Sequence, residues 1–202
     1  MKSTKESSRC SSTTGATSKS FPGTMGGNAS MNLYFMRHGS AVEADDPSVA
    51  NDNERPLADK GVKRLRRAAC GLSRLEIPFD GILTSPVLRA RQSAEIVATA
   101  LGLESRLEEV SGLAPESTVE HLLFGLTRYQ DREHLLLVGH EPLLSKTISS
   151  LLCASRGFEI ELRKGSLCRI EIDELPPSNP AILHWLLTPK HLRLLGNRAA
   201  KH

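Results

Sequence analysis

One apolar run near the middle of the chain constrains the fold more than any other feature. Leu135, Leu136, Leu137 and Val138 follow one another, Gly139 ends the run, and helical periodicity begins soon after it. A short strand that is apolar at every position is typical of the middle of a sheet whose two faces are both covered by helices. We therefore predict a buried strand over residues 134–138 and a helix over 142–152.

The same alternation of short apolar runs and helical periodicity extends along the chain. Strands are expected over 32–36, 81–84 and 107–110, and helices over 59–75, 86–101 and 119–126. The C-terminal part predicts strands over 158–162, 166–172 and 181–187, with turns at Lys164-Gly165 and Pro176-Pro177. This order predicts a three-layer α/β/α fold with a mostly parallel central sheet and an antiparallel C-terminal edge.

The 202 residues suit one domain with a tail at each end. Residues 1–30 are dominated by Ser, Thr and Gly, and their only aromatic residue is Phe21. Such a segment buries too little apolar surface to offset the entropy of ordering it, so we expect a disordered tail. The predicted domain covers residues 31–195, and residues 196–202 form a short basic tail.

Composition excludes several classes of protein. No apolar run approaches the roughly 20 residues that cross a bilayer, and the N-terminus lacks the apolar core of a secretory signal, so we expect a cytoplasmic protein without a membrane partner. A net charge of +3 with 4% aromatic residues argues against nucleic-acid binding. The four cysteines form no Cys-x-x-Cys pair and have no matching histidine spacing, which argues against a zinc site and a disulfide framework.

A basic run lies within the first predicted helix, at Lys63-Arg64-Leu65-Arg66-Arg67. A run of this kind is more often a solvated helix face than a site for a polyanion. Contact with an acidic protein partner is the alternative interpretation.

Three segments place histidine or arginine directly beyond a predicted strand. In open α/β sheets, ligands bind beyond the carboxyl ends of the strands, so these side chains are expected to converge. Each histidine could instead be a core imidazole satisfied by the backbone. The convergence favours an anion pocket that contains a nucleophile, and its segments are Arg37-His38-Gly39, Ser85-Pro86 with Arg89, and Gly139-His140.

Arg89 is expected in the opening turn of a helix that Ser85 caps and Pro86 begins. A cation is unfavourable there unless an anion binds beside it, because the helix dipole is positive at this end. A surface arginine reaching into water is the alternative. Gly139, before His140, is expected to let the backbone come close to a ligand.

These residues resemble the histidine phosphatase superfamily, also called phosphoglycerate-mutase-like, and within it the short SixA-type phosphohistidine phosphatases. The resemblance covers about residues 32–195 and is carried by Arg37-His38-Gly39, Arg55-Pro56-Leu57 through Gly61, Ser85-Pro86 with Leu88-Arg89-Ala90, and Gly139-His140 with Pro142. It implies that His38 is the phosphorylated nucleophile and that Arg37 and Arg89 grip the phosphoryl oxygens. It further implies that His140 completes the pocket and that Arg55 and Gly39 contribute to substrate binding.

The chemistry agrees with those implied roles. A neutral imidazole can attack phosphorus at neutral pH without a base to activate it. The two arginines and a protonated His140 can stabilise the charge on the three equatorial oxygens of a loose transition state, so no metal or cofactor is required.

The resemblance implies a phosphatase that acts on a histidine-phosphorylated protein, such as a carrier domain, and we expect it to work as a monomer. Many larger members carry a glutamate after the third strand that protonates an alkoxide leaving group. Here Glu116 either has that role or only precedes the next helix. A small-molecule phosphomonoesterase that uses Glu116 or Glu120 as its acid is one alternative, and a non-catalytic phosphate-sensing module is another.

Overall fold

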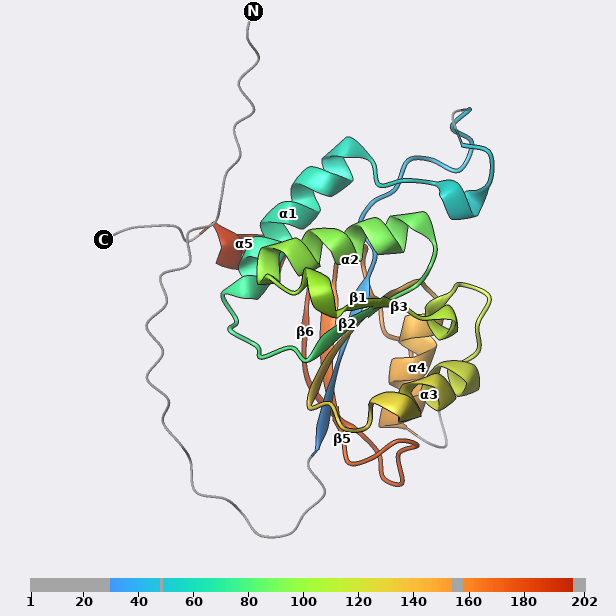
Figure 1. Cartoon of the computed structure of the whole chain (residues 1–202), viewed down its shortest axis with the longest axis vertical. Helices are drawn as coiled ribbons and strands as arrows, with labels where there is room; N and C mark the ends of the chain where they lie inside the picture. The colour runs from blue at the N-terminus through green and yellow to red at the C-terminus, as the bar shows by residue number, and fades with distance from the viewer. Residues whose placement is uncertain (1–29, 48, 154–157, 198–202) are drawn as a thin grey trace, which may run out of the picture.

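The structure, a computed structural model, describes residues 30–47, 49–153 and 158–197. In these residues a sheet of six strands lies between two layers of helices (Figure 1). The strands are β1 (Met31–Arg37), β2 (Gly81–Thr84), β3 (Leu107–Glu109), β4 (His134–Gly139), β5 (Leu167–Ile172) and β6 (Ile182–Leu187). The helices are α1 (Asp59–Ser73), α2 (Leu88–Leu101), α3 (Val119–Leu126), α4 (Leu143–Leu152) and α5 (Pro189–Gly196), with short 3-10 turns at Asp52–Glu54, Glu104–Arg106, Ser111–Leu113 and Thr127–Tyr129.

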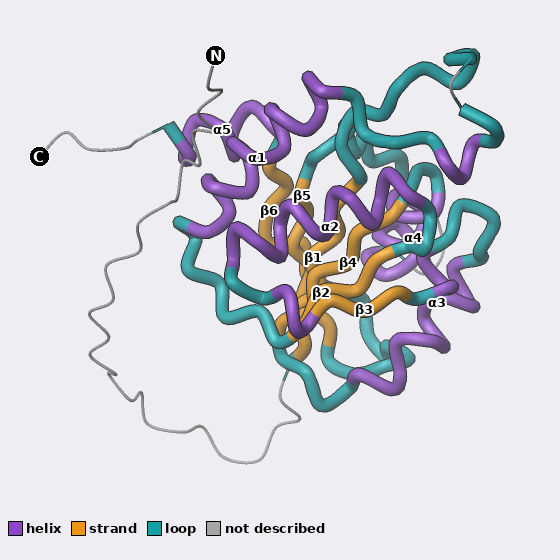
Figure 2. The backbone as a smooth tube through the Cα atoms, turned by 45° about the horizontal axis from the view of Figure 1, so that its top comes forward, coloured by secondary structure: helices purple, strands orange, loops and turns teal. Residues whose placement is uncertain are grey.

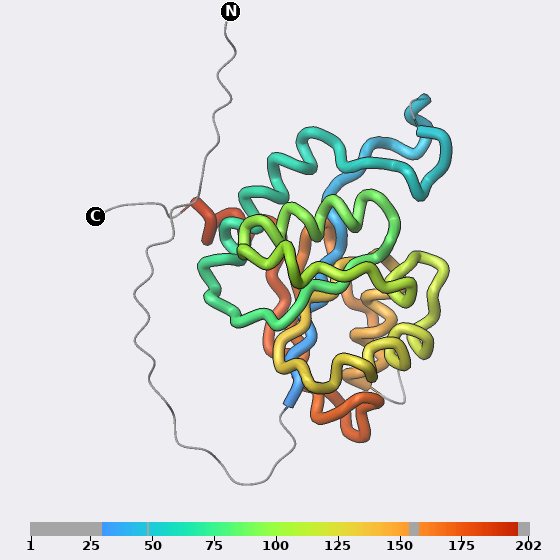
Figure 3. The backbone as a smooth tube through the Cα atoms, in the orientation of Figure 1, coloured from blue at the N-terminus to red at the C-terminus, as the bar shows by residue number. Residues whose placement is uncertain are grey.

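The strand order confirms the predicted fold class. The sheet runs β3-β2-β4-β1-β5-β6, with β1, β2, β3 and β4 parallel and β5 antiparallel to both β1 and β6. Strands that are far apart in the chain therefore lie side by side, as the colours of Figure 3 show for β1 and the C-terminal strands. Apart from Ser30, the predicted N-terminal tail lies outside the described residues, as does the C-terminal tail from residue 198.

Each face of the sheet has its own apolar core. On β1, Leu33 and Phe35 belong to the core that includes α3 and α4 residues, whereas Tyr34 and Met36 belong to the core that includes α1, α2 and α5 residues. Figure 2 shows these two groups of helices on either side of the strands. Strand β4 alternates in the same way and is buried on both faces, which confirms the interpretation of its all-apolar run. No helix in the described part of the chain is long and apolar enough to cross a membrane.

Some predicted elements differ from the structure. Residues 158–162 form no strand, and the Leu162 carbonyl instead accepts a hydrogen bond from the Arg37 side chain at 2.9 Å. Helix α2 begins at Leu88 rather than at residue 86, because Val87 remains extended and its N–H donates to the Ser85 hydroxyl at 3.2 Å. Helix α5 was not predicted, although the predicted domain over residues 31–195 covers most of it.

Candidate active site

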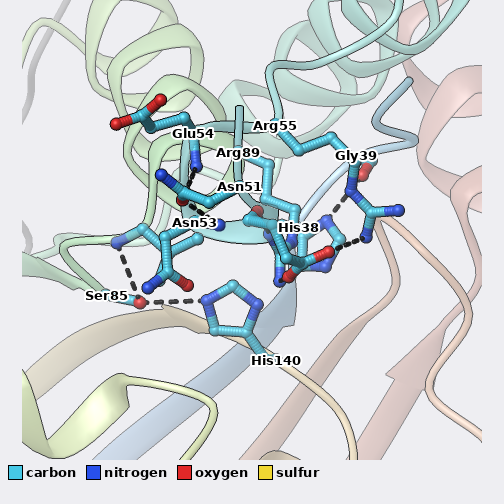
Figure 4. Close-up of polar contacts among 11 residues, drawn as sticks. His38, Gly39, Asn51, Asn53, Glu54, Arg55, Ser85, Arg89 and His140 are labelled. Atoms are coloured by element: carbon cyan, nitrogen blue, oxygen red, sulfur yellow. Dashed lines mark hydrogen bonds and ion pairs between the residues drawn. The ribbon is translucent and has the colours of Figure 1, made fainter. Parts of the chain in front are cut away.

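The carboxyl ends of β1, β2 and β4 meet at one edge of the sheet. Arg37 and Gly139, the last residues of β1 and β4, are register partners. The His38 N–H donates to the Gly139 carbonyl at 3.1 Å, and the Ser85 N–H donates to the Val138 carbonyl at 3.0 Å. The three segments singled out from the sequence therefore lie together, as Figure 4 shows for His38, Ser85, Arg89 and His140.

His38 is held in one orientation by backbone groups. Its Nδ1 lies 2.7 Å from the Gly39 carbonyl oxygen, which can only accept, so Nδ1 carries the proton and Nε2 keeps its lone pair. The Gly39 N–H donates to the Ser93 hydroxyl at 3.0 Å, and that hydroxyl donates to the Arg89 carbonyl at 2.6 Å. Gly39 thus links His38 to α2, and both of its backbone polar groups are engaged in doing so.

The surroundings of His38 keep its imidazole neutral. Burial and the positive charges of Arg89, Arg37 and Lys164 together lower the pKa of His38 to about 4, although the hydrogen bond to Gly39 opposes them in part. At neutral pH the free lone pair on Nε2 is therefore available to attack an electrophile.

His140 faces His38, with 5.0 Å between the ring centroids. Its Nε2 lies 2.9 Å from the Ser85 hydroxyl, which already accepts the Val87 N–H. Among the described residues, Nε2 is the one acceptor bonded to this buried hydroxyl, so we assign the hydroxyl proton to that bond, and the ring proton of His140 is then on Nδ1.

His140 is neutral in this pocket, contrary to the expectation of a protonated ring. Burial, and then the charges of His38, Arg89 and Arg37, lower the pKa of His140 to about 3. The ring can therefore help to hold an anion as a hydrogen-bond donor through Nδ1, but it adds no positive charge at neutral pH.

Asp52, which the sequence analysis did not single out, contacts two of the arginines. Its carboxylate lies 2.9 Å from Arg89 Nη2 and 3.0 Å from Arg55 Nη2, and its carbonyl accepts from Arg89 Nη1 at 2.6 Å. Arg89 is buried, whereas the Asp52 side chain is 57% exposed. An anion bound at Arg89 must therefore share the guanidinium with an internal carboxylate.

Unpartnered donors mark the centre of the site. Within the described residues, five buried side-chain nitrogen or oxygen atoms have no hydrogen-bond partner, and four of them are Arg37 Nε, Arg55 Nε, Arg89 Nε and His140 Nδ1. Leaving a buried donor without a partner costs about 1–3 kcal/mol, so such a group of donors is expected where a ligand accepts their protons. Four nitrogen donors, three of them cationic, suit a phosphoryl group or another oxyanion.

Gly139 does not lie against a ligand site as expected, and Glu116 precedes a helix, which was one of its two interpretations. A Cβ at Gly139 would meet the Leu144 side chain at 3.1 Å, so this glycine allows α4 to pack closely rather than a ligand to approach. Glu116 is exposed in a turn before α3, which Thr118 caps at its N-terminus. Glu120 is exposed on α3 and lines a separate cavity with Pro142 and Lys146.

No group of three or more His, Cys, Asp or Glu residues that could hold a metal occurs among the residues described.

Comparisons with known proteins point the same way. Residues 33–114 match the family model of the histidine phosphatase superfamily (branch 1). An uncharacterized protein of Picosynechococcus sp. is 40% identical over 68% of this chain and 82% of its own length. Phosphohistidine phosphatase SixA of Escherichia coli is 28% identical over 81% of this chain and 98% of its own length. A solved structure of the protein histidine phosphatase SixA, complexed with tungstate, has a TM-score of 0.69 at 27% identity, covering 80% of this chain and 99% of that one.

Proposed function

The chain belongs to the histidine phosphatase superfamily, and from this premise we propose that it removes phosphate from histidine-phosphorylated proteins through a covalent intermediate on His38. The observation that carries the proposal is the pairing of an unprotonated imidazole with a group of buried donors that lack partners. The imidazole supplies the nucleophile, and the buried donors hold the phosphoryl group that the imidazole attacks. The name of the Escherichia coli relative supports the choice of phosphohistidine as the substrate.

In the first step, Nε2 of His38 forms a bond to phosphorus while the bond from phosphorus to the substrate nitrogen breaks. The substrate imidazole leaves as a neutral group when its other nitrogen already carries a proton, so this step needs no acid from the enzyme. The transition-state charge is spread over the equatorial oxygens, and in this proposal Arg37, Arg89 and the Nδ1 proton of His140 hold them. The support for these roles is that Arg37 Nε, Arg89 Nε and His140 Nδ1 are buried and have no partner among the described residues.

In the second step, water attacks the phosphorus and the bond from phosphorus to Nε2 breaks. The Gly39 carbonyl keeps the proton on Nδ1 throughout, so His38 also leaves as a neutral imidazole. Both protons of the water remain on the product, dihydrogen phosphate. The enzyme returns to its starting state with no proton gained or lost.

The test compares two classes of substrate on one enzyme. We expect release of phosphate from a phosphohistidine carrier domain and little release from p-nitrophenyl phosphate, with an acid-labile radiolabel on the wild-type protein. His38→Ala should lose both the label and the turnover, whereas His140→Ala should keep a reduced but measurable rate, because only His38 forms the covalent bond. His184→Ala, which changes a histidine on the edge strand β6, is the matched control. Full activity in His38→Ala would refute the nucleophile assignment, and binding without a label would indicate a phosphate-sensing module.

A further inference from the structure

We propose that a basic cavity beside the nucleophile binds an acidic side chain of the phosphoprotein substrate, a proposal that rests on the function proposed above. The cavity has a volume of about 100 Å³ and lies between α1, α5 and the turn at Lys164-Gly165. Three cations line it, Arg64, Lys164 and Arg193, and its lining contains no aspartate or glutamate.

The three cations form no ion pair within the described residues, unlike several arginines elsewhere on the surface. Arg91, Arg128 and Arg163 each form an ion pair with a nearby glutamate, at 3.4, 3.3 and 3.2 Å. None of the cavity cations forms an ion pair with any residue that the structure describes. Unpaired charges of one sign that line a concavity concentrate the electrostatic potential and attract the opposite charge.

Rigid elements carry these cations. The Gly165 N–H donates to the carbonyls of both Arg37 and His38, at 2.9 and 3.1 Å, so the turn with Lys164 is fastened to the nucleophile's own backbone. Helices α1 and α5 are in backbone contact, because a Cβ at Gly71 would lie 1.8 Å from the Leu192 carbonyl oxygen. The helices that carry Arg64 and Arg193 are therefore fixed relative to each other before any partner binds, which lowers the entropy cost of binding.

The cavity adjoins His38 through the two residues that follow it in the chain. Gly39 and Ser40, which directly follow His38, form part of its lining. A substrate that places its phosphohistidine over His38 would thus bring a neighbouring side chain over the cavity. Sites for small-molecule ligands usually measure about 300–1,000 Å³, so a cavity of about 100 Å³ suits a single carboxylate rather than a separate metabolite.

The basic run at 63–67 had two interpretations, a solvated helix face and a contact for an acidic protein partner, and in this proposal each applies to part of the run. Of its four cations, only Arg64 lines the cavity, whereas Lys63, Arg66 and Arg67 are exposed on α1 outside it. The run is therefore a solvated helix face with one residue that faces the partner. Arg66 consequently offers a matched control, since it lies on the same helix and carries the same charge.

The experiment uses two phosphohistidine peptides, one with glutamate on both sides of the phosphohistidine and one with lysine. We expect wild-type protein to have a kcat/KM roughly tenfold higher for the glutamate peptide than for the lysine peptide. The difference should lie in KM, because charges at the edge of an interface act mainly on association. Arg64→Glu should abolish or invert the preference, and Arg66→Glu should retain it. Arg193→Gln provides a milder second variant, expected to reduce the preference, and thermal unfolding checks that each variant is folded.

The outcomes separate the two proposals. Equal kcat/KM for both peptides on the wild-type protein would overturn the inference and leave the proposed function intact. The inference would also be overturned if Arg64→Glu and Arg66→Glu changed the preference for the glutamate peptide equally, since general surface charge would then explain the preference. Failure to hydrolyse either peptide would overturn the proposed function and the inference with it. Hydrolysis of phosphoramidate, which has no flanking side chains, should be the same in all three arginine variants and the wild type.

Discussion

The Ser85 hydroxyl lies 2.9 Å from Nε2 of His140 and connects two segments that are 55 residues apart in the chain. Ser85 follows β2, and His140 follows β4, so the contact depends on the parallel pairing of these neighbouring strands. The hydroxyl accepts from the Val87 N–H and donates to the ring, which leaves the remaining ring proton on Nδ1, one of the buried donors without a partner in the described residues. Ser85, which the sequence indicates as a helix cap, therefore orients the His140 ring.

Replacing Ser85 with alanine should lower kcat by about three- to tenfold, because one hydrogen bond worth about 0.5–1.5 kcal/mol no longer selects the ring tautomer and orientation of His140. The measurement is steady-state hydrolysis of a phosphohistidine protein. Ser145→Ala removes a hydroxyl that bonds only to the Pro142 carbonyl on the exposed side of α4, and it should have no such effect. An unchanged kcat in Ser85→Ala would show that His140 needs no help in orientation.

Acid should destabilise the fold through the two buried histidines. Their pKa values fall from 6.5 to about 4 for His38 and about 3 for His140, so the unfolded chain binds more protons than the folded chain below about pH 6.5. The stability that these neutral rings contribute is complete above pH 6.5 and is lost as the pH falls through their folded pKa values. A shift from 6.5 to about 4 corresponds to about 3 kcal/mol for His38.

We therefore expect His38→Gln to reduce the loss in the free energy of unfolding between pH 7 and pH 4.5, measured with urea. His121→Gln is the control, because this exposed histidine on α3 has its ring beside the Ser117 hydroxyl and forms no ion pair with a carboxylate in the described residues, and it should leave the pH dependence as in the wild type. An identical pH dependence in wild type and His38→Gln would mean that the ring is protonated in the folded protein without cost.

Asp52→Asn should strengthen the binding of a phosphate-like anion such as orthovanadate. The carboxylate shares Arg89 and Arg55 with any bound anion, and removing its charge frees both guanidiniums. A partly exposed ion pair is worth about 0.2–1 kcal/mol, so the inhibition constant should fall by up to about fivefold. Asp45→Asn changes an exposed carboxylate in the same segment and serves as the control. Weaker inhibition in Asp52→Asn would instead assign Asp52 to orienting Arg89.

Most of the fold, and the grouping of the central residues of the candidate site, could be predicted from the sequence because both follow from local patterns. The apolar run of β4 indicates a strand buried on both faces, and the parallel sheet then brings His38 and His140 to one edge. The missed features depend on contacts between distant segments. Asp52 is one of several acids in its loop, and its contact with Arg89 depends on how that loop folds back. Helix α5 had a local signal, since Thr188 before Pro189 is a cap followed by a first-turn proline.

The leaving group separates the proposed function from the monoesterase alternative. Glu116→Gln and Glu120→Gln should each leave phosphohistidine hydrolysis within about twofold of wild type, because the imidazole leaving group carries its own proton and both carboxylates are exposed. The measurement is kcat/KM on a phosphohistidine protein and on p-nitrophenyl phosphate in parallel, with Glu95→Gln on α2 as the control. A loss of about a hundredfold in either variant is the size expected for removing a general acid. That result would identify the carboxylate as the proton donor. The proposed function would then be that of a phosphomonoesterase and not of a phosphohistidine phosphatase.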